Sequence, residues 1–412
     1  MTIGRRGLLL AAAAASVPFR ARAQSGSQSG VPIRIGVLTD LSGQYSDTAG
    51  VTSIACTQQA IDEARAAAPG LQVELLSADH QQKADLALNI ARQWIDRDGV
   101  DVITNCNNSA IGLAISNLCH DRNKVSLNTG AATAELTGSA CNANLVQWTY
   151  DTWEIAHSTG VSTVQSGGDK WFFIAADYAF GRAMQADLTR WVTQAGGKVL
   201  GTAFYPFPGT TDFSSFLLQG QASGANVIGL LNAGGDFVNC IKQAHEFGIM
   251  PPKVKLAGTA AFINSIHALG LETAQGLTYT ESFYWDLNDR TRAFTKRAVA
   301  RTPDNYPNQI QAGDYSATTH YLKIVNQMGM AQAKASGAAT VAAMKAMPTD
   351  DDAYGKGSIR IDGRHVHDVY LLEAKRPSES KGEWDLLKVV KTVPAAEAFR
   401  PLADGGCPLV RS

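Results

Sequence analysis

The sequence lacks the motifs with which many nucleotide-binding and hydrolytic enzymes hold their substrates. No G-x-G-x-x-G motif follows a predicted strand, and no G-x-x-x-x-G-K-[ST], G-x-S-x-G or H-E-x-x-H motif occurs in its 412 residues. Charged residues make up only 18% of the chain and the net charge is -1, so no basic excess favours nucleic acid or an anionic membrane. We therefore expect no catalytic centre, no cofactor and no nucleic-acid partner.

Membrane-spanning and metal-binding patterns are scarce as well. Beyond residue 23, no hydrophobic run is long enough to cross a bilayer. His365 and His367 alternate along one predicted strand and could hold a metal together, but no third ligand is evident. We expect no metal site and interpret both histidines as solvated side chains.

The six cysteines include no C-x-x-C pair, which argues against a zinc site or a dithiol redox site. Three of them lie on segments with helical spacing of apolar residues and are interpreted as plain buried cysteines: Cys56, Cys119 and Cys240. Cys141 and Cys407 lie in polar, turn-rich segments, so we favour a disulfide between them that ties the tail to the body. Six cysteines allow many pairings, and the sequence alone leaves the pairing open.

The first residues have the pattern of an export signal. Arg5-Arg6 precede an apolar run over 8–17, and Ala21-Arg22-Ala23 forms a small-x-small cleavage site. We expect residues 1–23 to be removed and residues 24–31 to form a linker, with export by either the twin-arginine or the general route. No cysteine lies at the cleavage site itself, so we expect a periplasmic protein without a lipid anchor.

The rest of the chain alternates short β-rich runs with helical segments of about 10–17 residues, which predicts βα units around parallel sheets. The first series has strands over 33–38, 71–76, 100–104 and 124–128, with helices over 52–68, 83–98 and 111–121. The second series has strands over 171–175, 199–204, 227–231 and 254–256, with helices over 182–195, 213–222 and 237–247. The fold class is therefore α/β, with two doubly wound parallel-sheet lobes.

Three thin crossings should connect these lobes as a hinge. We place them at 148–151, which has a strand-like pattern, at 277–285 and at 355–368, and we expect helices over 291–301 and 312–328 to return to lobe 1. Lobe 1 then comprises residues 32–149 and 286–354, lobe 2 residues 150–285 and 355–393, and the C-terminal tail residues 394–412. A ligand would bind in the gap between the lobes.

The turns that follow the predicted strands carry small polar residues and lead into helices. In open α/β sheets, ligands bind beyond the carboxyl ends of the strands, and the amides of a helix N-terminus suit an anion such as a carboxylate. Any one of these residues could instead cap or pack against a helix start, but several such turns at one sheet edge favour binding. The candidate ligand-binding residues are Tyr45, Asn108, Ser109, Ala131, Ala132, Thr133, Tyr178, Asp236 and Thr259.

The order and spacing of several motifs resemble the leucine/isoleucine/valine-type periplasmic binding proteins, which serve branched-chain amino acid ABC transporters. The resemblance covers nearly all of the chain after the signal. It is carried by residues 35–43 (IGVLTDLSG), 108–109 (NS), 128–133 (NTGAAT), 177–181 (DYAFG) and 211–213 (TDF). It implies a type I periplasmic binding protein fold, a small carboxylate or amino-acid ligand, a membrane permease as partner and a monomeric state. It also implies that Ser109, Ala131 and Thr133 hold a ligand carboxylate and that Tyr178 closes over the ligand.

The sequence departs from that family at two positions. Ala260 stands where amino-acid-binding members have an acidic residue for the ligand ammonium, and Ala233-Gly234 replace an aromatic residue. These changes favour a larger carboxylate without an amino group, such as a benzoate or a hydroxycinnamate, unless Asp236 or Glu281 replaces the missing acid. A sensory protein that feeds a chemoreceptor or kinase is an alternative function, and an enzyme is a more distant one.

Overall fold

The computed structural model describes residues 31–249 and 253–410. The predicted export signal (1–23) and all but the last residue of the predicted linker (24–31) lie outside the described residues. Within the described ranges, no helix has both the length and the apolar character needed to cross a membrane.

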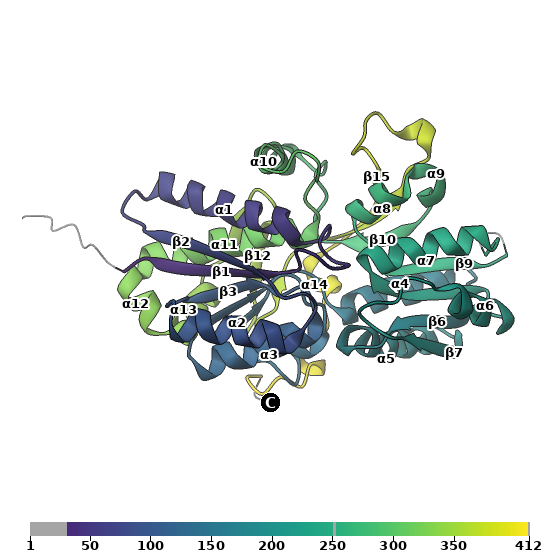
Figure 1. The fold of residues 1–412 in the computed structure, drawn as a ribbon, viewed down its shortest axis with the longest axis horizontal. Coiled ribbons are helices and arrows are strands. Elements are labelled where there is room, and N and C mark those ends of the chain that lie inside the picture. Colours follow the sequence, from purple (N-terminus) through teal and green to yellow (C-terminus); the bar gives the residue numbers. More distant parts are fainter. Residues whose placement is uncertain (1–30, 250–252, 411–412) are drawn as a thin grey trace, which may run out of the picture. The chain divides into compact units, whose positions relative to one another are not determined.

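The first lobe is built on a parallel sheet with strand order β2-β1-β3-β4-β5. Its strands are short apolar runs, and β1 pairs with both β2 and β3, for example at Ile35 with Leu75 and Val102. Helices cover both faces, as parallel strands with two apolar faces require (Figure 1). The strands are β1 (Ile33–Thr39), β2 (Val73–Asp79), β3 (Val102–Asn105), β4 (Val125–Asn128) and β5 (Leu145–Gln147). The helices include α1 (Gly50–Ala67) and α11 (Gln309–Met328) on one face, and α2 (Ala84–Asp96) and α3 (Ser109–Asp121) on the other.

The second lobe repeats this plan with strand order β7-β6-β8-β9, again all parallel. In both sheets the second strand along the chain lies outside the first, and the third and fourth follow on the other side. The two predicted doubly wound lobes are therefore confirmed. The strands are β6 (Lys170–Ala176), β7 (Lys198–Tyr205), β8 (Val227–Ala233) and β9 (Lys255–Ala260). The helices are α4 (Thr152–Gln165) and α5 (Ala179–Gln194) on one face, with α6 (Ser214–Ala222), α7 (Gly234–Glu246) and α8 (Ile263–Leu269) on the other.

The remaining elements complete the two lobes. Phe294 of α10 and Ala312 of α11 pack into the same cluster as Ile35, so these helices return to lobe 1 as predicted. An antiparallel sheet, β10-β14-β15, packs Tyr279 and Leu372 into the core of lobe 2. The other elements are α9 (Leu271–Ala274), β10 (Thr278–Glu281), α10 (Asp289–Val299), α12 (Met330–Ala335), α13 (Gly337–Ala346), β11 (Thr349–Asp351), β12 (Gly355–Ile359), β13 (His365–Val366), β14 (Val369–Ala374), β15 (Leu387–Val393) and α14 (Ala395–Ala398), with 3-10 turns at Ala134–Thr137, Pro377–Glu379 and Leu402–Asp404.

The first crossing between the lobes differs from the sequence prediction. The strand is β5, which ends at Gln147, and residues 148–151 are irregular rather than strand-like. The helix that follows, α4, is missing from the predicted elements because few of its residues are apolar at helical spacing. Asp151 begins it as a helix cap: its carboxylate accepts a hydrogen bond from the Glu154 amide at 2.9 Å.

The C-terminal tail runs from lobe 2 back to lobe 1. Arg400 donates a hydrogen bond to the Ala134 carbonyl oxygen at 2.8 Å, and the structure pairs Cys141 with Cys407 as a disulfide, as predicted. Their Cα atoms are 5.6 Å apart, a normal spacing for such a bond. The free cysteines of the described residues are all buried: Cys56, Cys106, Cys119 and Cys240.

Buried charges join the first crossing to the third. Arg364, which has no exposed surface, forms an ion pair of 2.5 Å with Asp151 and also donates to the Thr149 carbonyl oxygen. The prediction that His365 and His367 are solvated is wrong, because both rings are fully buried beside Arg364. His365 stacks on Trp148 and His367 packs against Phe399 of the tail, so contacts from outside their own strand cover them.

The Glu154 carboxyl group at this crossing should make stability depend on pH. Burial, with the nearby Asp151 carboxylate, raises its pKa to about 8, and its Oε1 atom has no hydrogen-bond partner among the described residues. The folded protein then keeps a proton on Glu154 that the unfolded chain loses near pH 4.5. The free energy of unfolding of the wild type should therefore decrease as the pH rises from about 4.5 to 8. We expect Glu154→Gln to remove a slope of up to about 1.4 kcal/mol per pH unit. Urea unfolding at pH 5 and pH 8 measures it; equal slopes for the two proteins would contradict the prediction.

Candidate ligand-binding site

The candidate site is a cavity where the carboxyl ends of both parallel sheets meet. The space inside it that the centre of a water molecule can occupy is about 20 Å³, room for about one water. Loops and helix starts from both lobes contribute to its walls. The lining residues are Tyr45, Thr48, Asn107, Asn108, Ser109, Gly130, Ala132, Tyr150, Tyr178, Phe180, Ala233, Ala260, Phe262 and Ile310.

The loop after β1 is held in place by the buried carboxylate of Asp40. One of its oxygens accepts a hydrogen bond from the Gly43 amide at 2.7 Å, and the other accepts from the Tyr45 amide at 3.0 Å and the Gln82 side chain at 2.8 Å. An acidic side chain that binds its own following backbone is a common way to fix a turn. Asp40 thus places Tyr45 at the cavity without lining it.

At the start of α3, Asn108 and Ser109 have different roles. The side-chain oxygen of Asn108 accepts hydrogen bonds from the Ala110 and Ile111 backbone amides, so Asn108 caps the helix. The side-chain nitrogen of Asn108 donates to the side-chain oxygen of Gln82. Ser109 Oγ accepts a hydrogen bond from the Thr133 amide at 3.2 Å. Since a serine hydroxyl also carries one proton to donate, Ser109 can still bind an acceptor in the cavity.

The turn after β4 brings only part of the predicted set to the cavity. Ala132 lines it, and the Ala132 amide donates no hydrogen bond to the part of the chain that the structure describes. Ala131 and Thr133 do not line it: the Ala131 amide binds Asn128, and the Thr133 hydroxyl accepts from the Glu135 amide at 3.3 Å. The Ser109 hydroxyl and the Ala132 amide are therefore the donors on this wall that are free for an anion.

The opposite wall comes from lobe 2 and consists of aromatic side chains and short alanine side chains. Tyr178 stands at the start of α5, and its hydroxyl oxygen lies 2.8 Å from that of Tyr45. Burial raises the pKa of both tyrosines, so both hydroxyls stay protonated at neutral pH. Phe180 and Phe262 add apolar surface, and Ala233 adds a short side chain. This wall can cover the apolar part of a ligand while the tyrosine pair joins the lobes.

The other lobe 2 candidates point elsewhere. Asp236 accepts a hydrogen bond from the hydroxyl of Tyr205 on β7 at 2.8 Å. It is neither the cap of α7 nor part of the cavity lining, and burial raises its pKa to about 6. Thr259 donates to the Leu230 carbonyl oxygen at 2.8 Å and does not line the cavity either.

No charged side chain among the described residues lines the cavity. Glu281, the other acid that could replace Ala260, is buried; its two oxygens accept from the Ile263 amide at 3.0 Å and the Gln309 amide at 3.3 Å. Burial raises the pKa of Glu281 well above the usual range, and backbone amides already occupy both of its oxygens. The cavity therefore offers a ligand neutral donors and aromatic surface, with no counter-charge for an ammonium group.

Nine lining residues are absent from the sequence-based candidates: Thr48, Asn107, Gly130, Tyr150, Phe180, Ala233, Ala260, Phe262 and Ile310. Phe262 lies two residues after the end of β9, in the same turn region as the candidate Thr259. Thr48 and Ile310 lie at the starts of helices α1 and α11, where nothing in the local sequence indicates a ligand. They reach the cavity because α1 and α11 pack against each other in lobe 1.

Comparison with known proteins agrees with this architecture. Residues 32–383 match the model of a family described as periplasmic binding protein. The chain belongs to the periplasmic binding protein family. The predicted resemblance is thereby confirmed, as is the type I fold. No curated protein matches the sequence.

Solved structures of the family superpose on most of the chain. A periplasmic binding protein from Burkholderia mallei is 43% identical, with a TM-score of 0.88 over 92% of this chain and 99% of that one. A branched-chain amino acid ABC transporter periplasmic ligand-binding protein from Burkholderia xenovorans is 40% identical, with a TM-score of 0.79 over the same shares. A solute-binding protein from R. palustris, in complex with benzoate, shares 18% identity and the fold, with a TM-score of 0.80 over 92% of this chain and 100% of that one.

Proposed function

We propose that this protein captures a small carboxylate in the periplasm and delivers it to the membrane permease of an ABC importer. The observation that carries the proposal is the composition of the cavity: free hydroxyl and amide donors lie on the lobe 1 wall and aromatic side chains on the lobe 2 wall. The Burkholderia xenovorans relative, an ABC transporter protein 40% identical over 92% of this chain, supports the transport role.

A carboxylate suits the lobe 1 wall for two physical reasons. The Asn108 side chain caps the Ala110 and Ile111 amides of α3, but the positive end of the helix dipole still stabilises an anion near this helix start. The Ser109 hydroxyl and the Ala132 amide add donors that the protein itself leaves free. Ala131 and Thr133 hold this turn through their own hydrogen bonds, and we propose that they support the carboxylate site from behind.

The rest of the ligand should be apolar and should lack an amino group. Burying an ammonium group without a counter-charge costs several kcal/mol, and the cavity lining contains Ala260 where an acid would stand. The two short side chains, Ala233 and Ala260, would let the lobe 2 wall face a broader group such as a benzene ring once the lobes move apart to admit it. A solute-binding protein from R. palustris that shares this fold was solved in complex with benzoate, so the fold can accommodate such a ligand. We therefore favour an aromatic or branched aliphatic acid over an amino acid.

Capture would proceed by closure of the hinge between lobe 1 (32–149 and 286–354) and lobe 2 (150–285 and 355–393). Only contacts that form when the lobes meet can shift the balance toward the closed state. The hydroxyl pair of Tyr45 and Tyr178 is such a contact, because the two residues belong to different lobes. The protein would act as a monomer after removal of its export signal, whether by the twin-arginine or the general route.

A thermal-shift screen tests the ligand class. The panel contains benzoate, 4-hydroxybenzoate, a hydroxycinnamate, a branched aliphatic acid, L-leucine and benzamide, the last as a neutral match for benzoate. We expect one or more of the acids to raise the melting temperature, and L-leucine and benzamide to have little effect. A shift by L-leucine that exceeds that of every acid would contradict the predicted rejection of an amino group.

Replacing Tyr178 should weaken binding without unfolding the protein. Tyr178→Ala removes both the ring that faces the cavity and the hydroxyl that meets Tyr45, so we expect affinity to fall at least about tenfold. Tyr178→Phe keeps the ring and should lose less. Calorimetric titration with the best acid from the screen measures both variants. Unchanged affinity in Tyr178→Ala would show that the ligand binds elsewhere.

A further inference from the structure

Two adjacent residues of lobe 1, Gln44 and Tyr45, meet three loops of lobe 2 beside the cavity. The Gly235 amide donates a hydrogen bond to the Gln44 carbonyl oxygen at 3.0 Å. The Tyr45 hydroxyl meets that of Tyr178 at 2.8 Å, and the Tyr45 ring stacks on Phe207 with centroids 5.6 Å apart. We call Gln44, Tyr45, Tyr178, Phe207 and Gly235 the inter-lobe clamp.

Phe207 belongs to the clamp but, like Gln44 and Gly235, does not line the cavity. Its ring stacks on Tyr178 with centroids 4.4 Å apart and an interplanar angle of 17°, and on Tyr45 at 26°. It is half-buried and is not part of the cavity lining. Phe207 therefore contacts one tyrosine from each lobe, on a side of the tyrosine pair that does not belong to the cavity.

The loop that carries Phe207 is held at both ends. Before it, the buried Tyr205 binds Asp236 through its hydroxyl at 2.8 Å. After it, the Thr210 hydroxyl donates to the Pro206 carbonyl oxygen at 2.7 Å and closes the loop. This also gives Asp236 a role: it anchors the strand end from which Phe207 projects toward the tyrosines.

We propose that Phe207 is a positioning residue that holds the Tyr45–Tyr178 pair together and so slows ligand release. Offset stacked rings attract one another beyond the apolar area they bury. The stack on Tyr45 forms only when the lobes meet, so its free energy favours the closed state over the open state. Such a contact should change the dissociation rate more than the association rate. The inference rests on the proposed function and adds to it a residue outside the cavity lining.

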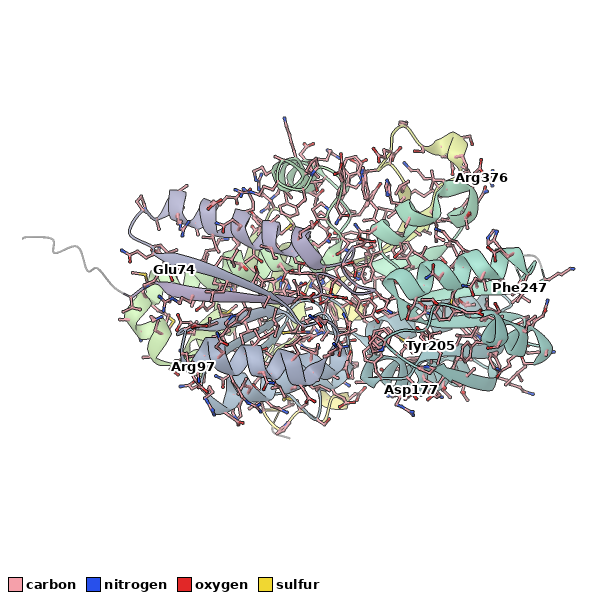
Figure 2. All side chains as sticks on the ribbon, in the orientation of Figure 1. Glu74, Arg97, Asp177, Tyr205, Phe247 and Arg376 are labelled. Atoms are coloured by element: carbon pink, nitrogen blue, oxygen red, sulfur yellow. A yellow bond between two sulfur atoms is a disulfide. The ribbon has the colours of Figure 1, made fainter. Side chains whose placement is uncertain are left out.

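Binding kinetics provide the first test, with benzoate and L-leucine as probe ligands. Phe207→Ala should raise the dissociation rate about tenfold and leave the association rate within about twofold of wild type. Phe207→Tyr keeps the stacked ring and should restore the wild-type rate. Phe247→Ala is the matched control, because Phe247 is an exposed phenylalanine of lobe 2 outside the clamp (Figure 2). An unchanged dissociation rate in Phe207→Ala would overturn the proposal.

The distance between the lobes provides a second test that needs no ligand. Spin labels are placed at the exposed positions Val51 of α1 and Leu218 of α6 through cysteine substitutions, and pulsed electron resonance measures their separation. We expect Phe207→Ala to reduce the short-distance population and Phe207→Tyr to retain it. If neither probe binds wild type, the choice of probe fails rather than the role of Phe207, and these distributions alone decide that role. A population equal to that of wild type, or no short-distance population in wild type, would overturn the proposal.

Discussion

Replacing Gly234 by alanine should weaken ligand binding at least about a hundredfold. This corresponds to two factors of ten in affinity, at about 1.4 kcal/mol of binding free energy each. A Cβ atom at this position would lie 2.2 Å from the Gln44 carbonyl oxygen and 2.9 Å from the Tyr45 ring. The nearest atom is backbone from the other lobe, so it cannot swing aside as a long side chain would. The lobes should therefore stop short of the closed arrangement, and the clamp should not form.

Two other glycines of lobe 2 provide controls for this variant. Gly234 has a φ of +55°, so alanine there also strains the backbone of lobe 2 by about 1–2 kcal/mol. Gly248→Ala imposes the same kind of strain at a φ of +65° with nothing within 4 Å, and it should lower stability without changing affinity. Gly235→Ala adds a Cβ that comes no closer than 3.8 Å to Gln44, and it should bind nearly as wild type. Calorimetric titration of all three measures the effect; similar affinities would contradict the steric block.

Arg364→Leu should lower the free energy of unfolding by about 3–5 kcal/mol, the usual cost of leaving one partner of a buried ion pair alone. Arg364 is fully buried and pairs with Asp151 at 2.5 Å, so the substitution leaves a carboxylate without its counter-charge. It also removes a hydrogen bond to the Thr149 carbonyl oxygen and the contact of the guanidinium with the Phe399 ring at 4.9 Å. Because these partners lie on the first crossing and the tail, the loss should loosen the hinge as well.

Arg292→Leu is the control for this second prediction. Arg292 also pairs with two carboxylates, Asp286 and Asp289, but all three side chains are well exposed. Water and salt screen such pairs, so we expect a loss below about 1 kcal/mol. Urea unfolding of both variants measures the difference. A loss for Arg364→Leu as small as that for Arg292→Leu would show that the buried pair contributes little.

The fold could be predicted in detail because its signals are local. Apolar runs such as 33–38 and 227–231 became β1 and β8, with ends shifted by no more than two residues. The errors have different causes. Helix α4 contains apolar residues but shows no clear helical period, and its start depends on the Asp151 cap. The histidines at 365 and 367 alternate as strand residues do, but the burial of both rings comes from Trp148, Phe399 and other distant residues.

The site could be predicted only in part. Tyr45, Asn108, Ser109, Ala132 and Tyr178 line the cavity, because the turn after each parallel strand lies at the same sheet edge. Thr133 and Asp236 lie in equally suitable turns, yet their oxygens accept hydrogen bonds from the Glu135 amide and from Tyr205. Whether a polar group in a turn meets a ligand or a neighbouring donor depends on atoms that its own segment does not contain.

The sequence alone determined that the chain forms two similar parallel-sheet lobes, which turns lie at their binding edges, and that no acid stands at position 260. These follow from hydrophobic period, turn composition and residue identity, all of which act over a few residues. Only the tertiary structure decided which hydroxyls stay free, that Gln44 and Tyr45 meet lobe 2, and that Phe207 stacks on both tyrosines. Those contacts join residues far apart in the chain, and their geometry depends on the packing of both lobes.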